Sequence, residues 1–157
     1  MNGELDALLA AVEAWPPVAA LRVSTLAYPL VNAAHVVGVA LLFGAIVPLD
    51  LRLAGWRHEA GPVDPFARLL IPVAIAGLVL AAASGLLLFA TDARAYAASW
   101  LFRIKIVLIA AAVANALALR RIDWRREPLA RRVRFAAAAS VLAWLAVIVL
   151  GRLIGYF

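Results

Sequence analysis

The sequence predicts an all-α integral membrane protein: a four-helix bundle preceded by a short N-terminal amphipathic interfacial helix. Of its 157 residues, 67% are hydrophobic and 15% are charged, whereas a soluble domain has roughly 45–50% apolar residues. A bilayer requires about 20 apolar residues per helix, and four such stretches lie between charged or Pro- and Gly-containing connectors. Because these stretches occupy most of the chain, we expect residues 1–157 to form one transmembrane domain.

The N-terminal segment predicts an amphipathic helix over residues 3–15. Leucines and Val12 recur at helical spacing, while Glu4, Asp6 and Glu13 occupy other faces. Two prolines follow and end the helix. Since its polar face is acidic, unlike that of basic lipid-binding helices, we expect it to pack against this protein or a partner at the outer surface.

The four apolar stretches predict the membrane-spanning helices, at residues 23–47, 69–90, 100–119 and 135–154. We expect Asp64 or Pro65 to mark the start of the second helix. Pro72 is expected in the first turn of that helix, where its missing N–H costs little.

Small residues recur one helical turn apart in the second stretch, at Gly77, Ala81 and Gly85. Spacing of this kind lets two backbones approach closely in a membrane, where apolar side chains gain nothing by leaving lipid. It predicts a helix packing face.

The distribution of basic residues predicts the orientation in the membrane. Seven of the fifteen lie between Arg120 and Arg134, which the positive-inside rule assigns to the cytoplasm. The first loop lies on the same side, and Arg52, Arg57 and Arg68 agree with this. We therefore expect both termini in the periplasm, with the bacterial inner membrane as the location. A basic loop of this kind explains the net charge without nucleic-acid binding.

Polar residues inside the first stretch predict a functional face. Tyr28, Asn32 and His35 fall at i, i+4 and i+7 on one side of a helix, and Gly38 continues the line. Polar groups at this depth avoid lipid, so we expect them to point into the bundle.

Two cations near the start of the third stretch cannot face the same way. Arg103 and Lys105 lie about 200° apart around a helix, so one lines the interior while the other snorkels to the headgroups. The deeper position of Lys105 favours it for the interior. With Arg152 at the same end, these residues predict a polar chamber open toward the periplasm, with His35 at its floor.

Other residues restrict the chemistry. The chain has no cysteine, which excludes thiolate metal sites, and it lacks the motifs of serine hydrolases, zinc proteases, P-loop enzymes and dinucleotide-binding enzymes. We therefore expect a non-enzymatic protein. Asp50 and Arg52 predict an interfacial pair that closes the end of the first helix, and His58 is expected in solvent.

Two segments resemble known membrane proteins. The patterns "HVVGVALLFGAIVPLDLRLAG" (35–55) and "GLLLFATDARAYAASWLFRIKIVLIAAAVANAL" (85–117) resemble those of an uncharacterised family of small bacterial four-span inner-membrane proteins. More distantly, the first is similar to the membrane domain of the copper resistance protein D group, which is allied to the two-haem membrane cytochromes. That resemblance implies haem b or copper on His35. Copper(I) favours sulfur ligands, and only Met1 supplies one.

Three hypotheses follow for function. In the first, His35 binds a b-type haem for electron transfer or sensing. The other axial ligand is then Lys105, or else Lys105, Arg103 and Arg152 bind the propionates. A homodimer could instead share the haem between two copies of His35. In the second, a chamber of Asn32, His35 and Lys105 binds or transports a metal ion, a small anion or a quinone-like molecule, with His35 as the metal ligand. In the third, the protein binds no cofactor and is an accessory subunit of a membrane complex.

Overall fold

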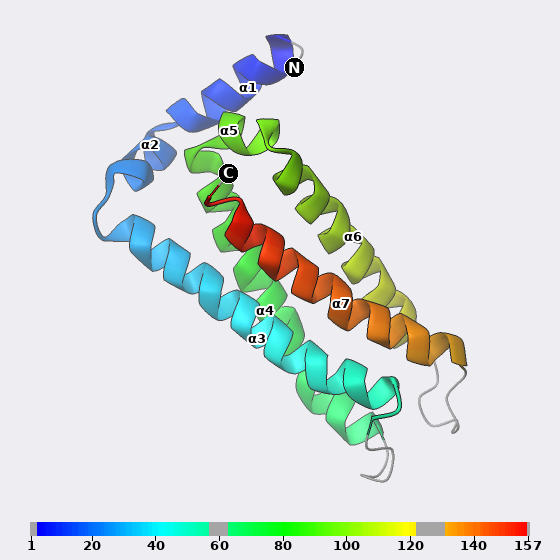
Figure 1. The fold of residues 1–157 in the computed structure, drawn as a ribbon. Helices are drawn as coiled ribbons and strands as arrows, with labels where there is room; N and C mark the ends of the chain where they lie inside the picture. Colours follow the sequence, from blue (N-terminus) through cyan, green and yellow to red (C-terminus); the bar gives the residue numbers. More distant parts are fainter. Residues whose placement is uncertain (1–2, 57–62, 122–130, 157) are drawn as a thin grey trace.

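The computed structural model describes residues 3–56, 63–121 and 131–156, and within them the chain is helical with no strand. Arg57 and His58 lie outside these residues. The helices are α1 (Gly3–Ala14), α2 (Pro16–Val23), α3 (Ala27–Leu53), α4 (Val63–Thr91), α5 (Ala93–Ala98), α6 (Trp100–Arg120) and α7 (Arg131–Leu153). Figure 1 shows four long helices side by side, with α1, α2 and α5 at one end. The predicted all-α four-helix bundle is confirmed.

The four long helices, α3, α4, α6 and α7, are each long and apolar enough to cross a membrane. They pack as two pairs, α3 with α4 and α6 with α7, and the contact of α3 with α7 joins the pairs. Within the described residues, α4 and α6 form no comparable interface. The chain is therefore a multi-pass membrane protein whose bundle is packed less tightly between α4 and α6.

The first membrane helix begins and ends later than the predicted 23–47. Pro16 and Pro17 follow the end of α1, as expected, and they also start α2, because a proline in the first turn of a helix sacrifices no hydrogen bond. Helix α2 ends at Val23. The Oγ of Ser24 then accepts a hydrogen bond from the backbone N–H of Ala27 at 2.9 Å, and α3 begins at Ala27.

Pro48 lies inside α3 rather than after it. A proline removes one backbone hydrogen bond, which membrane helices tolerate when neighbouring helices pack around the site. Here Leu49 and Leu53 are buried against Val63 and Ala67 of α4 and Ala137 of α7. This packing continues the helix to Leu53, so the hydropathy of the sequence underestimated its length.

The predicted position of Pro72 in a first helical turn is wrong. Helix α4 already begins at Val63, so Pro72 lies inside it. Asp64 and Pro65 do lie in the first turn, as expected.

The connector before the third membrane helix also contains α5. Ser99 then caps α6 by accepting a hydrogen bond from the N–H of Phe102 at 3.4 Å.

Glycines bring α3 and α4 together. A Cβ atom added to Gly38 would lie 2.5 Å from the Ala81 nitrogen, and one added to Gly77 would lie 2.8 Å from the Gly38 carbonyl oxygen. Both are closer than non-bonded atoms allow, so only hydrogen fits between these backbones. The packing role predicted for Gly77 and Ala81 is confirmed, and Gly38 is their partner.

Alanine at Gly38 or Gly77 should therefore destabilise the protein. Overpacking costs about 1–3 kcal/mol, whereas a Cβ at Gly44 would meet nothing within 4 Å and alanine there gains up to about 1 kcal/mol of helix propensity. Thermal unfolding in detergent should rank Gly44→Ala at or above wild type and both other variants below it. Equal melting temperatures for all three variants would contradict the close crossing.

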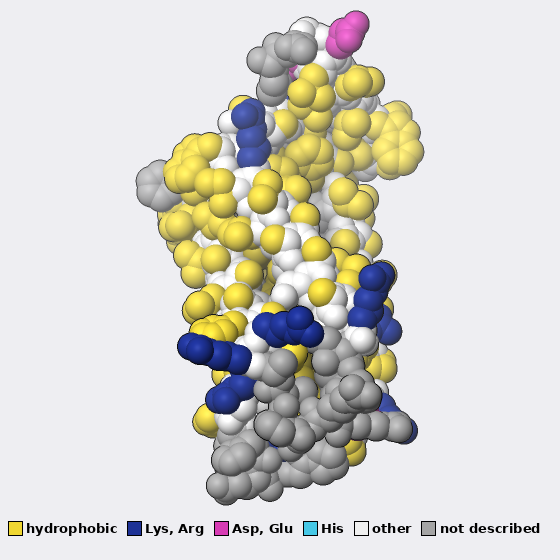
Figure 2. Space-filling view, turned by 90° about the vertical axis from the view of Figure 1, so that its right-hand side faces the viewer, with side chains coloured by type: hydrophobic (Ala, Val, Ile, Leu, Met, Phe, Trp, Pro, Cys, Tyr) yellow, Lys and Arg dark blue, Asp and Glu magenta, His cyan; other side chains and the backbone are white. Residues whose placement is uncertain are grey.

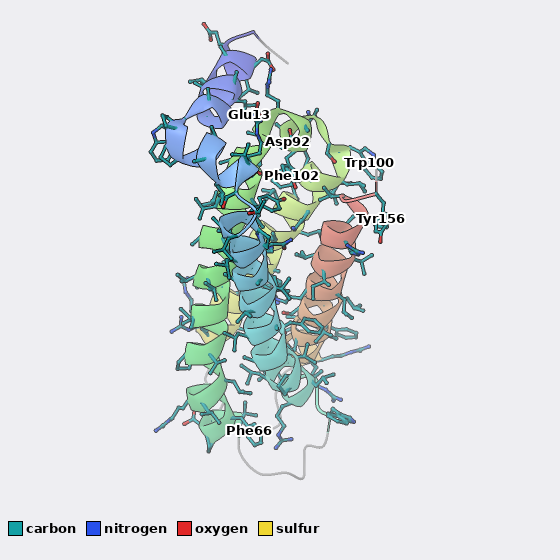
Figure 3. All side chains as sticks on the ribbon, turned by 90° about the vertical axis from the view of Figure 1, so that its left-hand side faces the viewer. Glu13, Phe66, Asp92, Trp100, Phe102 and Tyr156 are labelled. Atoms are coloured by element: carbon teal, nitrogen blue, oxygen red, sulfur yellow. The ribbon has the colours of Figure 1, made fainter. Side chains whose placement is uncertain are left out.

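A buried carboxylate holds α1 on the bundle. Glu13 accepts hydrogen bonds from the backbone N–H of Arg94 at 2.8 Å and from its Nε at 3.0 Å. Its side chain is 8% exposed. The apolar residues of this segment are instead exposed on the outside, namely Leu5, Leu8, Val12 and Trp15. The predicted interfacial helix is thus attached to α5 by Glu13, which Figure 3 shows at the α5 end of the bundle. Its apolar face is left uncovered.

The docking of α1 should weaken in acid. The hydrogen bond from the Arg94 backbone N–H holds the pKa of the Glu13 carboxyl below its ordinary value of 4.5. A lowered pKa means that the contribution is fully present above pH 4.5 and is lost as the pH falls below the folded-state pKa. The protection factors of the α1 amides, which compare their hydrogen exchange with that of an unfolded chain at the same pH, should therefore fall at low pH.

The variant Glu13→Gln should show that loss of protection already at neutral pH. Glu4→Gln, at an exposed position of the same helix, is the matched control and should leave the protection factors unchanged. Protection factors in α1 that depend on neither pH nor Glu13 would rule out the ion pair as the attachment.

Candidate functional site

His35 is held by one ring nitrogen against α4. Its Nδ1 lies 2.9 Å from the carbonyl oxygen of Ala81 and 3.2 Å from Oγ of Ser84. A carbonyl only accepts, and Ser84 directs its own hydroxyl hydrogen to the carbonyl of Leu80. These partners assign the proton to Nδ1, so Nε2 carries an unshared electron pair.

A glycine makes room for the imidazole. A Cβ at Gly85 would lie 3.0 Å from Cε1 of His35, so the ring lies over the bare backbone of α4. The recurring small residues of this helix therefore have two roles. Gly77 and Ala81 admit the backbone of α3, and Gly85 admits the side chain that α3 directs toward it.

Lys105 shares the interior with His35. The ammonium lies half-buried between α6 and α7, with Nζ 3.1 Å from where a Cβ of Gly151 would be, and it interacts electrostatically with the His35 ring. Among the described residues, no carboxylate forms an ion pair with it. The expectation that Lys105, rather than Arg103, faces inward agrees with this placement.

The other predicted cations lie outside the site. Arg103 is exposed and donates from Nε to the carbonyl oxygen of Ala97 at 2.9 Å, at the end of α5. Arg152 is exposed, donates to the hydroxyl of Tyr156 at 2.6 Å and lies 4.8 Å from the centre of its ring. Each is satisfied at its own helix end, so neither joins Lys105 in the interior.

The two remaining residues of the predicted polar face, Tyr28 and Asn32, differ in their exposure. Tyr28 is half-buried and close enough to Tyr96 of α5 to interact electrostatically. Asn32 is exposed, so the expectation that it points into the bundle is wrong. It lies about 60° from His35 on the side away from Gly38, and the buried line of α3 follows Gly38.

Sequence reasoning missed a second set of buried polar residues, in the half of the bundle toward the arginines. Asp50 is 5% exposed and hydrogen-bonds Ser140 of α7. It was expected at the membrane interface, paired with Arg52. The sequence pattern that could have revealed the burial of Asp50 is the helical spacing of apolar residues, which continues past Pro48 to Leu53.

The residues suit some ligands and exclude others. No group of three His, Cys, Asp or Glu side chains that could hold a metal ion occurs in the part of the chain that the structure describes, so a bare metal ion at His35 would lack a set of three such ligands there. A haem brings four nitrogen ligands of its own and needs one or two from the protein. Nε2 of His35 fits that requirement.

Comparison with protein-family models, curated proteins and solved structures finds no match to this chain. The site is therefore interpreted from its own chemistry.

The tautomer of His35 can be measured directly. In a His58→Gln background His35 is the single histidine, and its ¹⁵N chemical shifts should show a protonated Nδ1 and an unprotonated Nε2. Gly85→Ala should displace the ring and alter both shifts, while Gly44→Ala should not. A proton on Nε2 in the otherwise unaltered protein would contradict the assignment.

Proposed function

We propose that this protein binds a b-type haem in the inner membrane, through Nε2 of His35, as an electron-transfer or sensing module. The observation that supports this is the anchored Nδ1–H, since a backbone carbonyl acceptor is the usual partner that orients a ligating histidine. When bound, haem supplies one-electron redox chemistry or a site for a small gas. The chain supplies the ligand and its orientation.

One haem would satisfy both unusual features of the site. His35 presents an electron pair, while Lys105 presents an interior ammonium without a carboxylate partner among the described residues. The electron pair of His35 would bind the iron of a haem, and Lys105 would pair with a propionate or, after loss of its proton, supply a second ligand to the iron. The role proposed from sequence for Arg103 and Arg152 at the propionates is not retained, because both are engaged at the surface.

The proposed orientation places the arginine-rich end in the cytoplasm. At that end the described arginines are Arg52, Arg68, Arg120, Arg121, Arg131, Arg132 and Arg134, and Figure 2 shows basic side chains gathered toward it below a largely apolar surface. Such asymmetry supports the cytoplasmic side by the positive-inside rule. Both termini, and the His35 site, would then lie toward the periplasm.

An absorption spectrum tests the haem proposal. Protein purified from cells supplied with a haem precursor should show a Soret band, which His35→Ala should abolish and Lys105→Met should shift or weaken. His58→Ala, which removes the other histidine, is the matched control and should keep the band. Wild type without a Soret band, in a sample that melts as a folded protein, would refute the proposal.

A second candidate function is the binding or transport of a small anion, and the interior ammonium of Lys105 is the observation that favours it. In this case the purified protein has no Soret band, and Lys105→Gln loses anion binding while Arg103→Gln retains it.

The exposed amide of Asn32 supports a homo-oligomer or a partner subunit under either function. It lies in a helix long enough to cross the membrane, and polar groups in lipid are expected to bind a partner.

Thiol labelling tests the orientation. Because the chain has no cysteine, each single variant carries one reactive group. A membrane-impermeant maleimide added to intact cells whose outer membrane has been permeabilised should label Arg103→Cys rapidly, Lys105→Cys slowly, and Arg121→Cys only after the inner membrane is opened. Rapid labelling of Arg121→Cys in cells with an intact inner membrane would reverse the topology.

A further inference from the structure

A pocket lies in the arginine-rich half of the bundle, apart from the His35 site. It has a volume of about 120 Å³. Its two outer walls are side chains of α4 and α6, the pair of helices that form no tight interface, and they are apolar apart from Arg120. Helices α3 and α7 supply the back. Asp50, on that back wall, follows His35 by fifteen residues along α3, or about 22 Å. The wall residues of α4 and α6 are Ile71, Ala74, Ile75, Leu78, Val113, Ala116, Leu117, Leu119 and Arg120.

Two residues that line this pocket each carry a buried polar atom with no hydrogen-bond partner among the described residues: Oδ2 of Asp50 and Nε1 of Trp144. Their residues are 5% and 4% exposed, and both line the pocket. Ser140, next to them in the lining, already hydrogen-bonds the Asp50 carboxyl. The back wall thus offers one acceptor and one donor that the protein itself leaves unused.

Unused polar atoms at this depth point to a ligand. Buried polar groups are nearly always hydrogen-bonded, and lipid provides no substitute for water. A hydroxyl group would donate to Asp50 Oδ2, while a second oxygen would accept from the indole N–H of Trp144. The apolar walls require the rest of the ligand to be hydrocarbon or ring.

We propose that this pocket binds the head group of a membrane-soluble quinol, with the ring between α4 and α6 and a hydroxyl on Asp50. A quinol carries two oxygens on one apolar ring, so a single compact head can meet both the acceptor and the donor. Its hydrocarbon tail leaves between α4 and α6, where the bundle is loosely packed and faces lipid. The proposal is independent of haem at His35.

Binding to the full-length protein in nanodiscs tests the proposal, with a hydroquinone that carries a ten-carbon tail as the probe and its dimethyl ether as the matched control. The ether keeps the ring and the tail but cannot donate a hydrogen bond. We expect it to bind at least about tenfold more weakly, the effect of one lost hydrogen bond. Equal binding of the two probes, or no binding of the hydroquinone, would overturn the proposal and leave water as the partner of both atoms.

Variants separate binding from folding. Trp144→Phe removes the N–H and keeps an aromatic ring, and Asp50→Leu removes the carboxylate. Each should weaken hydroquinone binding about tenfold or more, while Trp100→Phe and Asp92→Asn, both exposed at the α5 end, should not. Trp144→Phe deletes only an unpartnered buried N–H, so its melting temperature should fall little. Asp50→Leu also removes the hydrogen bond with Ser140 and should melt lower. Should Asp50→Leu fail to fold, Trp144→Phe decides alone: unchanged affinity in that variant contradicts the proposal.

Discussion

The close crossing of α3 over α4 is the contact on which the rest of the site depends. Gly38 and Gly77 let the two backbones meet, and the same approach brings the Ala81 carbonyl within 2.9 Å of the His35 ring. One turn further along α4, Gly85 leaves space for that ring. Helix packing and imidazole anchoring are therefore one arrangement, because a wider crossing would leave Nδ1–H without an acceptor in a medium that offers none.

The polar groups of this protein fall into two classes. Those at the α5 end are matched within the chain, as in the contacts of Glu13 with Arg94 and of Arg103 with the Ala97 carbonyl. Those deeper in the bundle retain hydrogen-bonding capacity that no described residue uses, on Nε2 of His35 and on side-chain atoms of Asp50 and Trp144. Protein and solvent satisfy the first class with little difficulty. The second class is costly in a membrane, which is why we connect it with ligands.

The two candidate sites differ in chemistry as well as position. The site at His35 and Lys105 combines an electron pair with a positive charge, which suits a metal-centred ligand with acidic substituents. The pocket at Asp50 and Trp144 combines an acceptor with a donor inside apolar walls, which suits a neutral hydroxylated ring. Along α3, Asp50 follows His35 by fifteen residues, or about 22 Å. This separation means that either site can be altered without removing residues of the other.

The sequence by itself determined that the chain has four membrane helices, approximately where they lie, and that α4 carries a small-residue packing face, because hydropathy and spacing are properties of single segments. Helical geometry also separated Lys105 from Arg103. Only the tertiary structure decided the ends of α3, the exposure of Asn32, the hydrogen bonds of His35 and the burial of Asp50. Each of these depends on which neighbour a side chain meets, and a single helix contains no information about the neighbour that packs against it.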